Sequence, residues 1–203
     1  MMNPNLIEIK SDEYFIVDLI YASLKNNMTG INVYTEIGLG NRAFVHKDLW
    51  IKLQKVIPYL KLNNLKMKIC DAYRPPLAHK RMKEIIPQHG FFASLPEKSQ
   101  HCHGTAIDVC LCDRNGNELE YPTKVDAFDI NYAKQVQIGH LDAFFEHLKC
   151  ARHDYMECSS TAIKNREDLK LLMESIGLKS ISNEWWHYDL PNGCSKNYPM
   201  IEY

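Results

Sequence analysis

Two stretches of the chain show residue patterns that predict strands. In TAIDVCLC, residues 105–112, apolar residues alternate with smaller or polar ones, which is the period of a strand with one face on the core. Asp108 is then expected on the other face. LKMKICDAY at 65–73 also reads as a strand, and the Pro75-Pro76 pair that follows prevents its continuation.

The residues after the first stretch carry a turn signal. Asn115 and Gly116 lie in DRNGNELE, residues 113–120, and an Asn-Gly pair after a strand is typical of a hairpin. The chain is therefore expected to return as an antiparallel strand.

Four further segments show patterns typical of helices. They span residues 46–62, 77–86, 132–149 and 165–176. Gly177 directly follows the last of them and is expected to cap its C-terminal end. Because strands and helices do not strictly alternate, we expect an α+β fold. Residues 1–203 would form a single domain, with a central, mostly antiparallel sheet and helices packed around it.

Length and charge change this picture little. A chain of 203 residues is long enough to bury a substantial core. Lys and Arg total 24 against 25 Asp and Glu, without a basic run, so neither nucleic acid nor an anionic membrane is the expected partner. A small, roughly neutral ligand fits better. Charged residues interrupt every apolar run near the N-terminus, so we expect no export signal, no spanning helix and a cytoplasmic protein.

The seven cysteines do not show the CxxC spacing of zinc fingers or redox sites. Reduced, structural thiols are the expected state. Cys102, Cys110 and Cys112 nevertheless cluster in the sequence, which leaves a thiolate metal site as an alternative.

Two short motifs together predict a zinc site. SQHCHGTAIDVCL, residues 99–111, contains His101 and Asp108, and NEWWHYDL, residues 183–190, contains His187. Three ligands of these types, with a fourth position left for water, are typical of catalytic zinc. Gly104 would let the chain turn between the first histidine and the aspartate. Glu184, three residues before His187, would serve as proton acceptor if the strand bends or bulges there.

Simpler interpretations exist for each part of this pattern. His–x6–Asp is a weak signal in a chain with nine histidines, and His101 would then only cap a loop. Glu184 would be a surface carboxylate, His187 a core histidine, and Trp185 and Trp186 ordinary core residues. The other histidines are interpreted as structural or solvated: those at positions 46, 79, 89, 103, 140, 147 and 153.

The two motifs resemble the SxHxxGxAxD and ExxH motifs of the zinc D-Ala-D-Ala dipeptidases associated with vancomycin resistance, a branch of the D,D-carboxypeptidase-like zinc peptidases. Three more stretches are similar to that family, so the resemblance spans nearly the whole chain. They are DLIYASLKNNMTGINVY (18–34), CDAYRPP (70–76) and NREDLKLLMESIGL (165–178).

The resemblance implies a role for each matching residue. His101, Asp108 and His187 match the zinc ligands, with one zinc per chain. Glu184 matches the catalytic base, and Arg74 matches the arginine that polarises the scissile carbonyl. Ser99 matches a serine that binds the terminal carboxylate of the substrate, and Tyr21 and Asp129 match residues near its free amine. The segment TKVDAFD departs from the family pattern, which makes Asp126 a rival of Asp129.

The activity implied by the resemblance is hydrolysis of D-Ala-D-Ala, a cell-wall peptidoglycan precursor, to two D-alanines. Two alternatives remain open. One is a peptidoglycan D,D- or L,D-carboxypeptidase of the same family, which would normally require export. The other is a non-catalytic zinc-binding module, which would have no need of Glu184 and Arg74.

Overall fold

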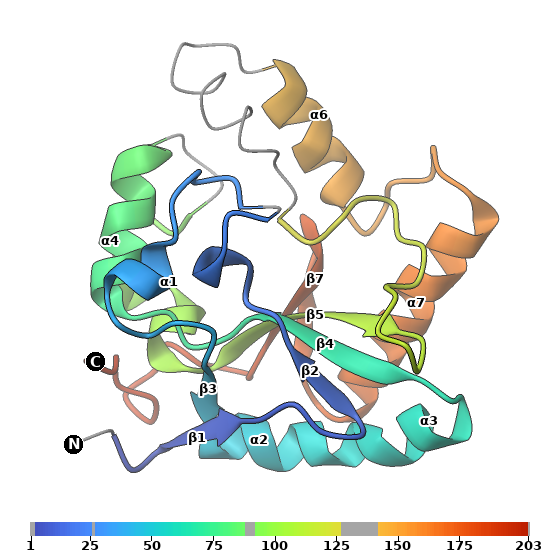
Figure 1. Ribbon diagram of the computed structural model, residues 1–203, viewed down its shortest axis with the longest axis horizontal. Coiled ribbons are helices and arrows are strands. Elements are labelled where there is room, and N and C mark those ends of the chain that lie inside the picture. The colour runs from blue at the N-terminus through green and yellow to red at the C-terminus, as the bar shows by residue number, and fades with distance from the viewer. Residues whose placement is uncertain (1–2, 26, 88–91, 127–141, 203) are drawn as a thin grey trace.

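The computed structural model describes residues 3–25, 27–87, 92–126 and 142–202 (Figure 1). Its main sheet has five strands in the order β2-β4-β5-β7-β6. These are β2 (Phe15–Val17), β4 (Lys66–Asp71), β5 (Ala106–Cys112), β7 (Glu184–Asp189) and β6 (Lys179–Ile181). Only the β2–β4 pair is parallel. A separate antiparallel pair joins β1 (Leu6–Ile9) to β3 (Ala43–His46).

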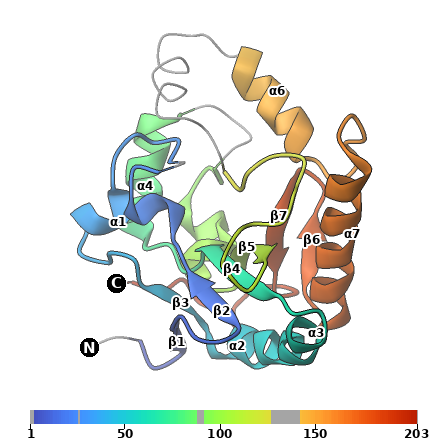
Figure 2. The same cartoon turned by 45° about the vertical axis from the view of Figure 1, so that its right-hand side comes forward.

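Helices surround the main sheet, which confirms the expected α+β fold (Figures 1 and 2). One group, consecutive in the chain, lies below the sheet in Figure 1: α2 (Lys47–Leu53), η2 (Gln54–Val56) and α3 (Ile57–Leu62). α7 (Ser160–Ser175) packs beside β6 and β7. The remaining helices are α1 (Val33–Glu36), α4 (Pro76–Ile85), α6 (Asp142–Ala151) and three short turns, η1 (Ile20–Ala22), η3 (Pro96–Lys98) and η4 (Gln100–His103). None of the described helices is long and apolar enough to cross a membrane.

Three of the four predicted helices are present with shifted ends, and the fourth is present in its described part. The segment 46–62 is covered by α2, η2 and α3, and the segment 77–86 by α4. α7 begins earlier than predicted because the Ser159 hydroxyl accepts a hydrogen bond from the Ala162 amide at 3.0 Å. Gly177 follows this helix with φ of +79°, as expected of a capping glycine. Of the segment 132–149, residues 132–141 lie outside the described residues, and the rest is in α6.

β5 is a central strand whose seven residues are all buried, so both of its faces are covered and Asp108 points into a buried site. One expectation for the predicted strands needs correction. The predicted hairpin reduces to a turn and a single bridge between Cys112 and Glu118. The returning chain does not continue as a strand, since the Leu111 amide donates to the Tyr121 hydroxyl rather than to a backbone carbonyl.

The register of the sheet brings polar residues of three strands together. Asp108 on β5 lies opposite Asp71 on β4 and opposite His187 on β7. Residues opposite one another on neighbouring strands share a face of the sheet. Three polar residues from distant parts of the sequence therefore meet in one row across a largely apolar sheet.

Candidate active site

His101, Asp108 and His187 converge on one point. Their potential ligand atoms all lie within 4.8 Å of one another, and all three residues are buried. Asp108 and His187 come from paired strands, whereas His101 lies on η4. Gly104 ends η4 in the left-handed conformation, with φ of +68°, where a Cβ atom would lie 3.1 Å from the His46 amide nitrogen. The expected glycine turn between His101 and Asp108 is thus present.

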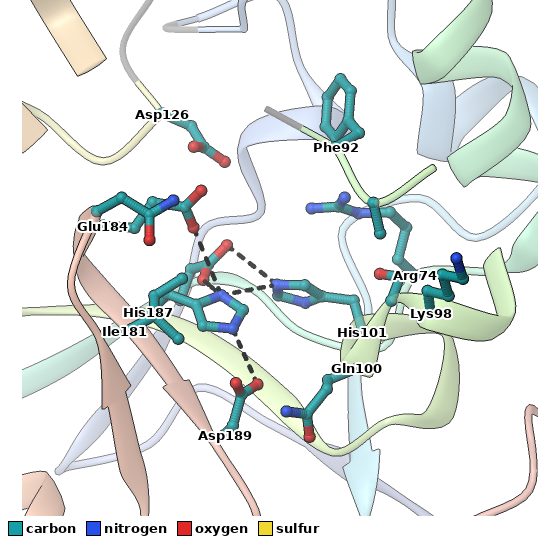
Figure 3. A pocket seen from close by; sticks show the side chains of 14 residues that line it. Arg74, Phe92, Lys98, Gln100, His101, Asp126, Ile181, Glu184, His187 and Asp189 are labelled. Carbon is teal, nitrogen blue, oxygen red and sulfur yellow. Dashed lines mark hydrogen bonds and ion pairs between the residues drawn. The ribbon is translucent and has the colours of Figure 1, made fainter. Parts of the chain in front are cut away.

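The hydrogen bonds of the two histidines turn one nitrogen of each ring inward. Nδ1 of His101 lies 2.7 Å from the Ala72 carbonyl oxygen, and Nε2 of His187 lies 2.9 Å from Oδ1 of Asp189. With these outer nitrogens donating, the inner nitrogens are 3.3 Å apart and both face the Asp108 carboxylate (Figure 3). Two imidazole lone pairs and a carboxylate directed at one point fit a cation between them.

The charges of this group depend on one another. Burial by itself would raise the pKa of Asp108, but the charge and hydrogen bonds of His101 and His187 lower it below its ordinary value. Burial would lower the pKa of His187, but its bonds to Asp108 and Asp189 raise it well above the ordinary value. The site therefore stabilises positive charge next to Asp108, as a metal site must.

Glu184 reaches the same site through a bulge in β7. Ser180 pairs with Tyr188, yet the next residue of β6, Ile181, pairs with Glu184. The intervening residues of β7 bulge, which confirms the expected bend. Oε2 of Glu184 lies 3.7 Å from Nδ1 of His187, and 14 % of the glutamate side chain is exposed. Burial raises the pKa of Glu184 above its ordinary value, which suits a group that has to accept a proton and release it again.

Arg74 is held rigidly beside the histidines. Its Nε and Nη2 atoms donate to Oδ2 of Asp71 at 3.1 and 2.6 Å. The aromatic rings of Tyr21 and Phe92 lie 5.4 and 5.3 Å from the guanidinium carbon. The Arg74 amide donates to the His101 carbonyl at 3.0 Å. The guanidinium is thereby fixed at the wall of the cavity that His101 also lines.

The residues expected to bind substrate are only partly brought together. Ser99 is buried at the cavity wall. Asp126 also lines the cavity and accepts a hydrogen bond from the Tyr21 hydroxyl at 2.9 Å. Tyr21 itself is fully buried and contacts two residues of the cavity wall, Asp126 through its hydroxyl and Arg74 through its ring. Asp129 lies outside the described residues. Burial, followed by the nearby charges of Asp108 and Glu184, raises the pKa of Asp126 well above its ordinary value.

Comparison with known proteins agrees with this geometry. A sequence model of a family described as D-ala-D-ala dipeptidase matches residues 13–202. The chain belongs to this dipeptidase family. It is also 31% identical over 186 residues to the D-alanyl-D-alanine dipeptidase of Escherichia coli (strain K12), an alignment that covers 91% of this chain and 82% of the relative. Membership makes the protein a peptide hydrolase of a metal-dependent family, with a small peptide as substrate.

In this family member, the cavity holds about 370 Å³. It is lined by His101, Asp108 and His187, by Glu184, Arg74, Ser99 and Asp126, and by several residues that the sequence motifs did not identify. Among these, Asp189 orients His187 and shares its face of β7, because it lies two positions later in the strand. The alternation of a strand in the sequence His187-Tyr188-Asp189 was the signal that could have identified Asp189. Asp71, which accepts two hydrogen bonds from Arg74, is the last residue of β4 and lies three positions before the arginine.

The thiolate alternative receives no support from the described residues. Within them, the histidine–aspartate group alone has the geometry of a metal site. Cys102 lies near Ser99 and Cys194, whereas Cys110 lies near Cys70 and Cys112. Burial raises the pKa of Cys102 to about 12, so this thiol stays protonated near neutral pH.

Several other histidines have structural contacts. Both ring nitrogens of His103 bond to carbonyl oxygens, those of Tyr198 and Glu97. His46 caps α2 by accepting from the Asp48 amide, and His79 bonds to the Ala93 carbonyl. These three histidines therefore agree with the structural interpretation.

Proposed function

We propose that the protein hydrolyses the dipeptide D-Ala-D-Ala to two molecules of D-alanine in a zinc-dependent reaction. The observation that carries the proposal is the convergence of His101, Asp108, His187 and Glu184 in one cavity of a dipeptidase-family chain. Two imidazoles and one carboxylate are a usual ligand set for catalytic zinc. The E. coli relative, whose name specifies D-alanyl-D-alanine, supports the choice of substrate.

The chain's own residues would divide the reaction between them. Zinc held by His101, Asp108 and His187 would supply a Lewis acid that makes a nearby water more acidic. Glu184 takes the proton of the attacking water and passes it to the leaving amine. Arg74 donates hydrogen bonds to the carbonyl oxygen as negative charge develops on it.

The two ends of the substrate would be held on different sides of the cavity. The Ser99 hydroxyl donates to the terminal carboxylate. Asp126, oriented by Tyr21, lines the cavity wall and would accept a hydrogen bond from the free ammonium group. Asp129, which the resemblance matches to this role, lies outside the described residues and remains the rival candidate. A carboxylate at the amine end favours a dipeptide over a longer peptide, whose nitrogen at that position is an uncharged amide.

This arrangement predicts selectivity for a free amine. We expect release of D-alanine from D-Ala-D-Ala, and little release from N-acetyl-D-Ala-D-Ala or L-Ala-L-Ala. Asp126→Asn should lower kcat/KM for the free dipeptide by about 10–100-fold, the usual value of a hydrogen bond to a charged group, and should change the rate with the acetylated dipeptide little. An assay coupled to D-amino acid oxidase measures the first two substrates, and ninhydrin measures the third.

The same assay separates the alternatives. Comparable hydrolysis of the free and acetylated dipeptides would refute the dipeptidase proposal and favour a D,D-carboxypeptidase. An unchanged Asp126→Asn variant with intact selectivity would return the amine-binding role to Asp129. Absence of hydrolysis in zinc-loaded protein would favour a non-catalytic zinc-binding module.

A further inference from the structure

The active-site cavity contains one cation to which neither the sequence motifs nor the proposed mechanism gives a role. Four carboxylates line the cavity, those of Asp108, Asp126, Glu184 and Asp189, together with the two basic side chains of Arg74 and Lys98. Arg74 uses two of its nitrogens on Asp71. Lys98, by contrast, has no carboxylate within ion-pair distance in the part of the chain that the structure describes.

Lys98 occupies a defined position relative to the reaction centre. It is the last residue of η3 and directly precedes Ser99, which begins the turn that carries His101. In Figure 3 its side chain lies on the same side of the histidines as Arg74, whereas Asp126 and Glu184 lie on the other side. The cavity is therefore polarised, with the carboxylates of Asp126 and Glu184 at one end and the ammonium group of Lys98 at the other.

We infer that Lys98 recognises the terminal carboxylate of the dipeptide and so makes the enzyme selective for substrates with a free C-terminus. The inference rests on the proposed function. A dipeptide zwitterion carries its charges at opposite ends, and the cavity carries the opposite charges in the matching order. Ser99 contributes only a neutral hydroxyl, and the proposed mechanism uses the zinc and Arg74 at the scissile carbonyl. Lys98 is the positive group that is left for the substrate carboxylate.

The exposure of Lys98 is consistent with this role. The side chain is exposed in the free protein, so its ammonium group remains hydrated until substrate arrives and needs no buried partner. A lysine of this kind contributes to binding more than to the chemical step, because the substrate carboxylate has the same charge before and during hydrolysis. Its removal should consequently raise KM and leave kcat nearly unchanged.

The test compares two substrates on matched variants. D-Ala-D-Ala and its C-terminal carboxamide differ only in the charge at the end that Lys98 would contact. We expect Lys98→Gln to raise KM for D-Ala-D-Ala about tenfold with kcat within about twofold of wild type, and to leave KM for the carboxamide unchanged. The wild-type preference for the free acid should fall by the same factor. Lys98→Arg, which keeps the charge, should retain most of the preference.

The control for Lys98→Gln is the same substitution at a lysine outside the cavity. Lys61→Gln removes an exposed lysine of α3, away from the cavity, and should change neither substrate's kinetics. An equal change for acid and carboxamide in Lys98→Gln, or an unchanged preference, would overturn the inference while the dipeptidase proposal stands. If the zinc-loaded wild type hydrolyses neither substrate, the proposed function fails and the role of Lys98 fails with it.

Discussion

Replacement of Glu184 by glutamine is expected to lower kcat for D-Ala-D-Ala by about 10²–10⁴-fold, the usual contribution of a general base. Glutamine has nearly the same shape as glutamate but cannot accept the proton of the attacking water. Because Glu184 is not one of the three residues proposed to hold zinc, the variant should bind zinc as the wild type does. Steady-state kinetics and elemental analysis of the same preparation measure both quantities.

The matched control is Glu36→Gln at the exposed end of α1, which should behave as wild type in both measurements. A Glu184→Gln variant whose kcat stays within about threefold of wild type would remove Glu184 from the mechanism. Loss of zinc from that variant would instead make Glu184 a ligand.

Arg74→Lys should lower kcat by about 10²–10³-fold, the effect seen when one donor to a developing oxyanion is removed. Lysine keeps the positive charge but lacks the planar group that donates to Asp71 from two nitrogens. The charge would therefore no longer be fixed at the cavity wall. Kinetics with D-Ala-D-Ala at saturating concentration measure this loss in kcat.

Arg81→Lys provides the control, since Arg81 is an exposed arginine of α4 with only a surface ion pair to Glu84. It should leave kcat unchanged. A defect of Arg74→Lys that is confined to KM would reassign Arg74 to ground-state binding of the substrate.

Local patterns in the sequence predicted the elements that carry the site. The alternation in TAIDVCLC and the proline pair after residue 74 located β5 and β4. The requirement for a bend between Glu184 and His187 followed from the period of a strand, and the bulge in β7 confirms it. Position 104 required a glycine for a turn, and the turn is left-handed there.

Features that depend on contacts between distant segments could not be predicted in this way. The alternation of β5 indicated one face on the core, but the sequence does not show that both sides of this central strand are covered. Asp108 meets His187 through the register of β5 and β7, which is set by the packing of the whole sheet. The bond between Tyr21 and Asp126 joins residues 105 positions apart, so no local pattern could predict it.

The most direct test of zinc-dependent hydrolysis at the His101, Asp108 and His187 group is a titration of metal-free protein with zinc, with release of D-alanine from D-Ala-D-Ala as the readout. Activity should rise in proportion to added zinc and stop rising at one equivalent per chain. The same titration of His187→Ala should give neither tight zinc binding nor activity. Full activity in metal-free protein, or a His187→Ala variant that binds one equivalent and is active, would contradict the account.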